Sequence, residues 1–283
     1  RAVGGKVTDS LPTLSIDAVS VPEDTFDRAL ATLQADPSIA FAERDPVVRL
    51  FSPPSAWQPN DPFFKDQWGL VRTGIPSAWD LTRGSPDVVV AVLDTGADAN
   101  HEDLRGQLVD GYDFVHNTRT PDDDNGHGTH VTGIIAAAAN NGLGISGVAP
   151  GSRVMPIKVM SALGNGSHFV IAQGIEHALR NNARILNLSM GGDTPSQTLK
   201  QAVDHAWEVG ALVVAAAGND NTDKPSYPAA WPNVISVGAL NTDDTRAPFS
   251  NYGPTIPLVA PGVAILSTLP GNRYEAWPGT SMA

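Results

Sequence analysis

Cysteine is absent from the 283 residues of this chain. Its absence excludes thiol catalysis, thiolate metal sites and disulfide bonds. A continuous run of about 18 apolar residues is also missing, so we expect no membrane-spanning helix. Basic residues are few: 18 Lys and Arg stand against 30 Asp and Glu, and the formal net charge is −12. Such an acidic protein repels the phosphates of nucleic acids and anionic membrane surfaces, so neither is an expected partner.

The composition is that of a packed globular protein, with 41% hydrophobic and 17% charged residues. The 27 glycines and 23 prolines are spread along the chain and predict many loops and tight turns. The surplus of carboxylates has two interpretations, solubility and cation binding. The length predicts one large domain or two unequal ones.

The first 50 residues predict a small α+β unit. Residues 15–21 alternate polar and apolar, as a half-buried strand does, and residues 39–43 predict another strand. Between them a helix is expected from apolar residues at helical spacing: Phe26, Ala29, Leu30 and Leu33. So short a unit buries little surface, and we expect it to depend on a larger one.

Residues 51–62 contain four prolines and cannot pack as a helix or a central strand. The expected organisation is therefore a small domain at 1–50, a linker at 51–60 and a larger domain at 61–283.

The larger domain alternates buried strands with helices. Strands are predicted at four apolar runs: 88–93, 154–159, 185–189 and 211–216. Helices are predicted at three stretches: 130–140, 167–181 and 196–209. This alternation indicates an α/β fold with a doubly wound, mainly parallel sheet. Ligands of such sheets bind at the carboxyl ends of the strands, so the residues that follow each strand are candidates for a functional site.

Three short motifs could carry chemistry. The first strand ends in Asp94-Thr95-Gly96, a carboxylate that backbone donors can keep ionised, although an Asx turn or helix cap gives the same pattern. In the segment 125–131, His127 stands between two glycines in the first turn of a helix. A zinc site or a structural histidine is the alternative, but the His-Glu-x-x-His pattern is absent. In Gly279-Thr280-Ser281-Met282-Ala283, Ser281 suits a nucleophile that a base activates, or an ordinary N-cap.

Together the three motifs place Asp, His and Ser in the chain order known from subtilisin. Asp94–Gly96, His127–His130 and Gly279–Ala283 resemble the active-site signatures of subtilisin-like serine proteases, the subtilases. Residues from about 60 to 283 resemble the thermitase branch, and 1–50 resemble the back half of the inhibitor-type propeptide. The resemblance implies a secreted serine endopeptidase made as a zymogen. Ser281 would be its nucleophile, His127 its base and Asp94 the residue that orients the base.

The resemblance also implies a substrate site. Asn219, in Ala217-Gly218-Asn219, would donate its amide to the oxyanion, although a turn after a strand gives the same pattern. An extended peptide would lie between two edges: Ser189, Met190 and Gly191 on one side, and Gly164, Asn165 and Gly166 on the other. With Ala216, Ala217 and Gly218 also lining S1, the walls are small and uncharged. Broad specificity with an apolar or aromatic preference at P1 is therefore expected.

Calcium is the implied structural cofactor. A first site would use the side chains of Asp61, Asp103 and Asn141 with the carbonyls of Ala138, Leu143 and Ile145. A polar surface loop is the alternative interpretation of these residues. A second site would use Asp113, Thr120, Asp122 and Asp124, but Thr118 stands where a carboxylate is expected.

The resemblance implies more chain than is present. In the family a buried helix continues after the nucleophile, whereas this chain ends at Ala283 and begins at Arg1. We therefore expect a fragment, truncated at both ends and poorly active by itself. The expected partners are polypeptide substrates and its own propeptide, which would inhibit a monomeric enzyme until self-cleavage at 50–58.

Two other classes of function are considered. A non-catalytic subtilase homologue would act as a binding module. A dinucleotide-binding enzyme would need Gly-x-Gly-x-x-Gly after the first strand, where Asp94-Thr95-Gly96 stands instead.

Overall fold

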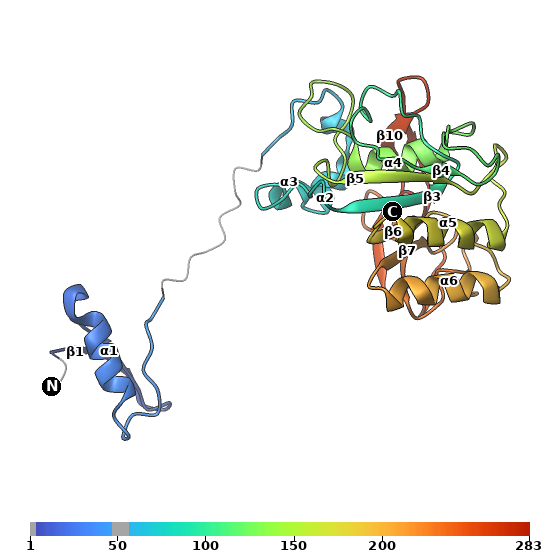
Figure 1. The fold of residues 1–283 in the computed structure, drawn as a ribbon. Helices are drawn as coiled ribbons and strands as arrows, with labels where there is room; N and C mark the ends of the chain where they lie inside the picture. Colours follow the sequence, from blue (N-terminus) through green and yellow to red (C-terminus); the bar gives the residue numbers. More distant parts are fainter. Residues whose placement is uncertain (1–3, 47–56) are drawn as a thin grey trace. The chain divides into compact units, whose positions relative to one another are not determined.

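The computed structural model describes residues 4–46 and 57–283. They divide into two compact units, one within Arg1–Ser52 and the other within Pro53–Ala283 (Figure 1). Most of the predicted linker at 51–60, and of the self-cleavage region at 50–58, lies outside the described residues. Within the described part of the chain, no helix is both long and apolar enough to cross a membrane.

The smaller unit contains a two-stranded antiparallel sheet and one helix. The strands are β1 (Lys6–Leu11) and β2 (Ile16–Ser20), and the helix is α1 (Phe26–Gln34), preceded by a 3-10 turn at Glu23–Thr25. β2 and α1 lie where the alternating and helical patterns predicted them. β1 has no clear alternation of its own and was not expected.

The predicted strand at residues 39–43 is wrong, because this segment has no regular structure. In the described residues the ladder of β1 and β2 has no third strand for it to join. Side chains hold the segment instead. Gln34 Nε2 donates to the carbonyl oxygen of Ala42 at 2.9 Å, and the Arg44 guanidinium lies 4.1 Å from the centre of the Phe26 ring.

The larger unit is built on a seven-stranded parallel sheet with the order β4-β5-β3-β6-β7-β8-β9. Its strands are β3 (Val89–Asp94), β4 (Tyr112–Asp113), β5 (Arg153–Lys158), β6 (Ile185–Leu188), β7 (Leu212–Ala216), β8 (Val234–Leu240) and β9 (Leu258–Pro261). The four predicted apolar runs are β3, β5, β6 and β7. The doubly wound, mainly parallel sheet is confirmed.

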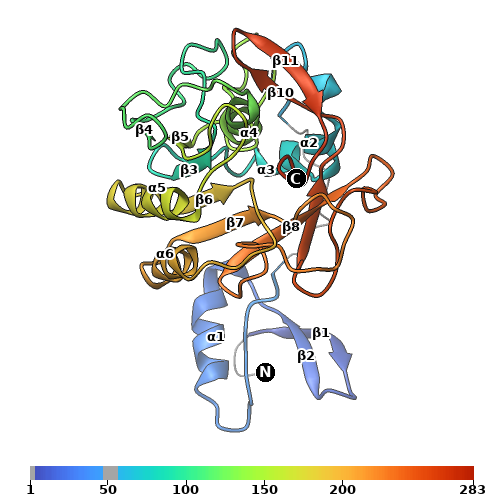
Figure 2. The ribbon, with the colours of Figure 1, turned by 90° about the vertical axis from the view of Figure 1, so that its right-hand side faces the viewer.

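Helices cover both faces of this sheet. They are α2 (Trp68–Arg72), which follows a 3-10 turn at Phe64–Asp66, α3 (Ile75–Ala78), α4 (His127–Ala136), α5 (His168–Arg180) and α6 (Gln197–Glu208). In Figures 1 and 2, α4 lies on one face, and α5 and α6 lie side by side on the other. β3 shows why its sequence is apolar throughout. Val92 packs in a cluster with Val131 of α4, whereas Leu93 packs in the opposite cluster with Ile175 of α5.

The helix boundaries have local causes. Serine hydroxyls cap α5 and α6: Ser167 accepts the N–H of Val170, and Ser196 accepts that of Leu199. The helix predicted at 130–140 is displaced, because α4 begins at His127 and ends at Ala136. The chain leaves the helix where the N–H of Ala138 donates to the carbonyl of Asp103 at 2.8 Å.

A second antiparallel pair, β10 (Ile265–Leu269) and β11 (Arg273–Trp277), packs against α4 and was not predicted (Figure 2). Ser267 and Thr268 of β10 donate their hydroxyls to carbonyl oxygens of α4, at 2.6 and 2.8 Å. The ring of His130 stacks on Trp277 with the centroids 4.8 Å apart. Burial lowers the pKa of His130 to about 4, so this second histidine of the His127–His130 motif is neutral and structural near neutral pH.

The order of strands reverses at β3. From β3 the chain passes through the edge strand β4 and then α4 to β5 on one side, and then returns through α5 to β6 on the other side. Ligands of parallel sheets bind where such a reversal opens a crevice at the carboxyl ends of the strands. Asp94 is the last residue of β3 and therefore lies at this point.

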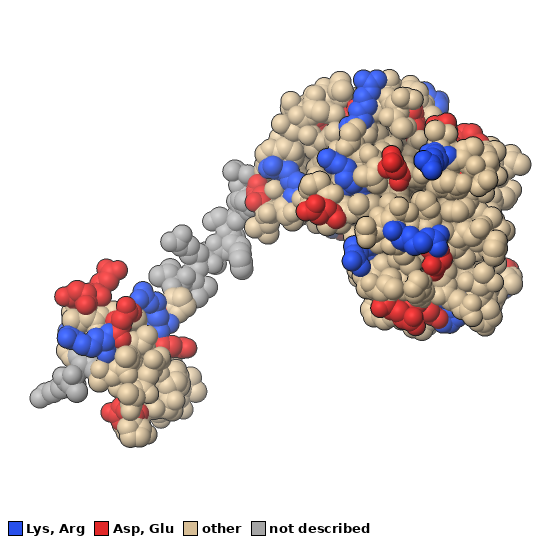
Figure 3. All heavy atoms as spheres, viewed as in Figure 1, with Lys and Arg blue, Asp and Glu red and all other residues tan. Residues whose placement is uncertain are grey.

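Charged side chains are mixed on the face drawn in Figure 3, where Lys and Arg lie among Asp and Glu. No single acidic field therefore covers this face.

Candidate active site

Asp94 and His127 meet at the carboxyl end of β3. His127 is the first residue of α4, and its Nδ1 lies 2.8 Å from Asp94 Oδ1 and 2.9 Å from Oδ2. The carboxylate is 2% exposed and also accepts the N–H of Thr95 at 2.7 Å. A carboxylate bound at Nδ1 fixes the imidazole in the tautomer whose Nε2 can accept a proton.

Opposing effects set the pKa of His127. Burial lowers it, but the hydrogen bond and charge of Asp94, together with the charge of Asp123, outweigh burial and raise the pKa above its usual 6.5. A raised pKa means that the neutral, proton-accepting ring prevails only at higher pH than for an ordinary histidine.

Ser281 lies against the end of β6. Its hydroxyl donates to the carbonyl oxygen of Ser189 at 3.1 Å, and the Ser189 hydroxyl donates to the carbonyl oxygen of Ser281 at 3.0 Å. Asn187 Nδ2 donates to the same Ser189 hydroxyl at 3.0 Å. Among the described residues, no hydrogen bond joins the Ser281 hydroxyl to His127.

Asn219 is tied to the residue that precedes Ser281. Its Oδ1 accepts both the N–H and the hydroxyl of Thr280, each at 2.9 Å. Asn219 Nδ2 donates to no protein group in the described chain, and the residue is exposed. An amide donor without a protein partner therefore lies on the residue bonded to Thr280, the neighbour of Ser281.

Asn251, which lies in none of the sequence motifs, holds the turn that carries Asn219. It is 3% exposed. Its Nδ2 donates to the carbonyl oxygen of Ala217 at 3.0 Å, and its Oδ1 accepts the N–H of Asp220 at 2.9 Å. Its own N–H donates to the carbonyl oxygen of Gly218 at 2.9 Å. The turn is so close to Asn251 that a Cβ on Gly218 would lie 2.3 Å from Asn251 Nδ2.

The predicted substrate residues follow β5, β6 and β7 at the same end of the sheet. Residues 164–166 are exposed in the loop between β5 and α5, where the N–H of Ser161 donates to the carbonyl of Asn165 at 2.9 Å. Residues 189–191 follow β6, with Gly191 exposed. Ala216 and Ala217, at the end of β7, are buried. The carboxyl ends of neighbouring parallel strands thus bring all three segments to one edge.

The residues of the first predicted calcium site gather around one loop. Asp61 accepts the N–H groups of Asn140 and Asn141 at 2.8 and 3.0 Å, and the hydroxyl of Ser146. Asp103 accepts Asn141 Nδ2 and the N–H of Ile145, each at 2.8 Å. Burial raises the pKa of Asp103, although these donors and Tyr274 oppose it. Ala138 and Leu143 lie on the same stretch of chain.

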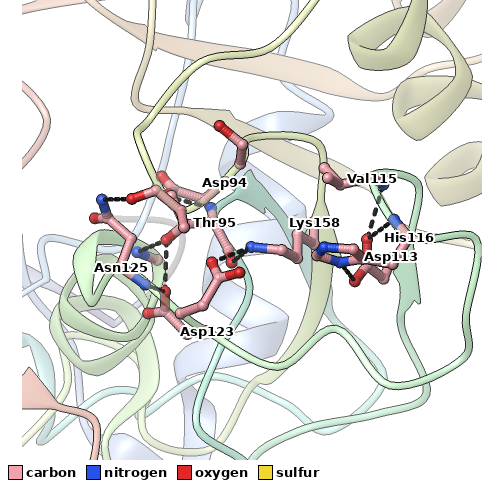
Figure 4. A network of polar contacts seen from close by, with 12 residues as sticks. Asp94, Thr95, Asp113, Val115, His116, Asp123, Asn125 and Lys158 are labelled. Carbon is pink, nitrogen blue, oxygen red and sulfur yellow. Dashed lines mark hydrogen bonds and ion pairs between the residues drawn. The ribbon is translucent and has the colours of Figure 1, made fainter.

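The residues of the second predicted site do not converge. Asp113 binds the ring and N–H of His116, and Asp124 Oδ1 accepts Nζ of the buried Lys158 at 2.5 Å. Figure 4 shows Asp113 with His116, and Lys158 extended toward the Asp94–Thr95 turn. Thr120 and Asp122 are exposed. In residues 4–46 and 57–283, no three His, Asp or Glu side chains are arranged to hold a metal ion.

Comparison with known proteins finds one family. The model of the subtilase family matches residues 85–283. The chain is 45% identical over 252 residues to a thermophilic serine proteinase of Bacillus sp. (strain AK1), covering 89% of this chain and 62% of that protein. It is 43% identical over 228 residues to thermitase of Thermoactinomyces vulgaris, covering 80% and 81%. This chain therefore spans less than two thirds of the Bacillus protein.

Solved structures agree with these relatives. A protease from Pseudoalteromonas arctica PAMC 21717 superposes with a TM-score of 0.75 at 34% identity, covering 80% of this chain and 83% of that one. A cold-adapted subtilisin-like serine proteinase gives a TM-score of 0.65 at 36% identity, covering 70% and 72%.

Proposed function

Because this chain belongs to the subtilase family, we propose that it is a serine endopeptidase precursor that cleaves peptide bonds through an acyl-enzyme. The Asp94–His127 contact of 2.8 Å carries this proposal, because it orients an imidazole base where the order of strands reverses. Two hydrogen bonds support it further. The Ser281 hydroxyl is bonded to Ser189 after β6, and Asn219 after the neighbouring β7 is bonded to Thr280.

In the proposed reaction, the Ser281 hydroxyl leaves Ser189, gives its proton to His127 Nε2 and attacks the peptide carbonyl. Asp94 holds the imidazole tautomer and stabilises its cationic form. Asn219 Nδ2 and the N–H of Ser281 donate to the oxyanion that forms. His127 then protonates the leaving amine, and a water molecule hydrolyses the acyl-enzyme with His127 again as base.

Substrate would bind as an added strand. We propose that an extended peptide lies between residues 164–166 and 189–191 and pairs through its main chain, which demands little of its sequence. Ala216, Ala217 and Gly218 add small, uncharged walls to S1. Broad specificity with an apolar or aromatic P1 residue is the result.

One assay tests the activity and the P1 preference together. Tetrapeptide anilides that differ only at P1 are compared by kcat/KM, and an aryl fluorophosphonate is used to label an activated serine. We expect faster cleavage with Phe or Leu than with Lys or Arg, and a label on Ser281 found by peptide mass mapping. A non-catalytic homologue would neither cleave nor be labelled, and a preference for Lys or Arg would contradict the proposed S1 pocket.

The family resemblance also supports a zymogen. We propose that residues 1–50 inhibit the peptidase domain at 61–283 until the chain cuts itself within 50–58, and that the enzyme is a secreted monomer. Self-cleavage requires the same Ser281, so the fate of the N-terminal segment reports on both proposals.

We further propose calcium at the first site. Asp61 and Asp103 supply carboxylates, Asn141 an amide oxygen, and Ala138, Leu143 and Ile145 carbonyls, which are the hard oxygen ligands that this ion binds. The two carboxylates are 4% and 0% exposed, and the donors that satisfy them come mostly from the loop 140–146. A bound cation would join that loop to Asp61 and Asp103 more strongly than N–H groups do.

Removal of calcium is therefore expected to lower the melting temperature. A ligand at 100 times its Kd stabilises the folded state by about 2.7 kcal/mol. At roughly 2–4 °C per kcal/mol for a domain of this size, the shift is about 5–10 °C. Calorimetry with calcium and with a chelator measures it. Asp61→Asn should abolish the difference, whereas Asp122→Asn, on an exposed residue of the second set, should keep it. A melting temperature that the chelator leaves unchanged would contradict the site.

A further inference from the structure

Asp123 collects five hydrogen bonds on one carboxylate. Its Oδ1 accepts the Thr95 hydroxyl at 2.8 Å and the N–H groups of Asn125 and Gly126 at 3.0 and 2.8 Å. Its Oδ2 accepts the N–H and the hydroxyl of Thr129 at 2.8 and 2.6 Å. Figure 4 shows the carboxylate between Thr95 and Asn125. Hydrogen bonds to a charged acceptor contribute more than neutral ones, so this residue is a strong local constraint.

These donors come from the two elements that meet at the candidate active site. Thr95 follows Asp94 at the end of β3, whereas Asn125, Gly126 and Thr129 enclose His127 at the start of α4. Two further bonds close the same unit: the N–H of Gly128 donates to the Thr95 hydroxyl at 2.9 Å, and the N–H of His127 donates to Asn125 Oδ1 at 3.1 Å. The carboxylate therefore links the residue beside Asp94 to the turn that holds His127.

The backbone that follows β3 and the first turn of α4 are in close contact. A Cβ on Gly128 would lie 2.1 Å from the carbonyl oxygen of Gly96, so the two backbones touch there. The other long helices of the sheet begin differently. Ser167 and Ser196 each accept one N–H at the starts of α5 and α6, and a neutral hydroxyl is enough. At α4 the Asp123 carboxylate bonds the first turn of the helix and also the Thr95 hydroxyl at the end of β3. Capping the helix would not require the bond to Thr95.

We propose that Asp123 is the positioning residue of the Asp94–His127 pair, and that its negative charge stabilises the imidazolium formed when His127 takes the proton of Ser281. This inference rests on the proposed protease function. Asp123 does not touch the reacting atoms. It acts through Thr95, through the first turn of α4 and through its charge.

Asp123→Asn in the full chain is the main test, with Asp122→Asn as the matched control. Both variants lose one charge in the same segment, but the exposed Asp122 has no side-chain hydrogen bond in the described structure. An amide at position 123 turns an NH₂ group toward N–H or O–H donors. We expect kcat to fall about 10- to 100-fold with KM nearly unchanged, since a misplacement near 1 Å can cost 10²-fold.

The pH profile separates this role from a merely structural one. Rates rise as His127 loses its proton, and the charge of Asp123 raises the pKa of that ring. Removing the charge lowers the pKa, so the acid limb of kcat/KM should move to lower pH in Asp123→Asn and remain in place in Asp122→Asn. A limb that is equal in both variants, or a kcat equal to that of the wild type, would overturn the proposal.

Thr95→Val is a second variant, which keeps the test decisive if Asp123→Asn fails to fold. It removes the hydroxyl that joins Asp123 to β3 and leaves every charge in place. A fall in kcat without a shift of the acid limb is expected, and an unchanged kcat would show that Asp123 does not position the pair through β3. If the wild-type chain neither cleaves peptides nor reacts with the fluorophosphonate, the protease function itself fails, which is a different outcome from either variant result.

Discussion

Replacing Ser281 with alanine is expected to lower kcat by about 10⁶-fold, the loss measured when the nucleophile of a subtilisin is removed. In the proposed mechanism, only the oxygen of Ser281 forms the acyl-enzyme. Without that oxygen, the proposed base His127 and the proposed oxyanion donor Asn219 would have no nucleophile to assist. The remaining acceleration over water should be about 10³–10⁴-fold, from binding and oxyanion stabilisation.

Steady-state hydrolysis of an apolar anilide measures this loss, and the intact mass of the chain measures self-cleavage. Ser281→Ala should keep residues 1–50 attached, whereas the wild type should release them. Ser236→Ala is the matched control, because this buried β8 hydroxyl has no hydrogen-bond partner among the described residues. A Ser281→Ala chain that still cleaves or matures at a comparable rate would exclude Ser281 as the nucleophile.

Asp94→Asn is expected to lower kcat by about 10⁴-fold, as the corresponding change does in another Ser-His-Asp protease. The shape of the side chain is kept, but an amide can turn its NH₂ toward Nδ1 and favour the tautomer that has no free base at Nε2. The change also removes the charge that helps to raise the pKa of His127. The acid limb of kcat/KM should therefore move to lower pH.

The pH profile of kcat/KM checks both effects in one series. Asp87→Asn is a suitable control, since this exposed residue precedes β3 at the opposite end of the strand that carries Asp94. Asp87→Asn should leave kcat and the acid limb of kcat/KM as they are in the wild type. An Asp94→Asn enzyme with nearly full kcat would show that Asp94 does not orient the base.

Much of the sheet could be predicted from sequence because a strand that is buried on both faces has a continuous apolar sequence. β3, β5, β6 and β7 have such runs, and Ser167 and Ser196 mark helix starts. The prediction of a strand at 39–43 was wrong because strand formation depends on pairing with another segment. In the described residues β1 and β2 pair only with each other, and side-chain contacts with α1 hold the segment instead. β10 and β11 were not predicted. They are stabilised by packing against α4, and the local periodicity of a sequence carries no information about such distant contacts.

The candidate site divides in the same way. Asp94 and His127 were found as short motifs, and the structure brings them into contact. Asn251 was missed because its partners are backbone groups 31 and 34 positions away, which only the fold brings to it. Asp123 was missed because its link to β3 runs through the hydroxyl of Thr95, 28 positions away. One signal for Asp123 was present, since a carboxylate just before a helix start favours its N-terminal end. Nothing in the sequence around Asn251 points to the turn at 217–220.

The parallel sheet has a consequence for how the chain folds. The contacts of the site join residues far apart in sequence: 33 positions for Asp94 and His127, 61 for Asn219 and Thr280, and 92 for Ser189 and Ser281. Chains dominated by such distant contacts fold slowly, because the entropy of closing long loops is lost before the contacts form. We therefore expect the proposed peptidase activity to appear only after these distant segments have come together. A newly made chain would then leave its unfolded neighbours uncut until its own site is assembled.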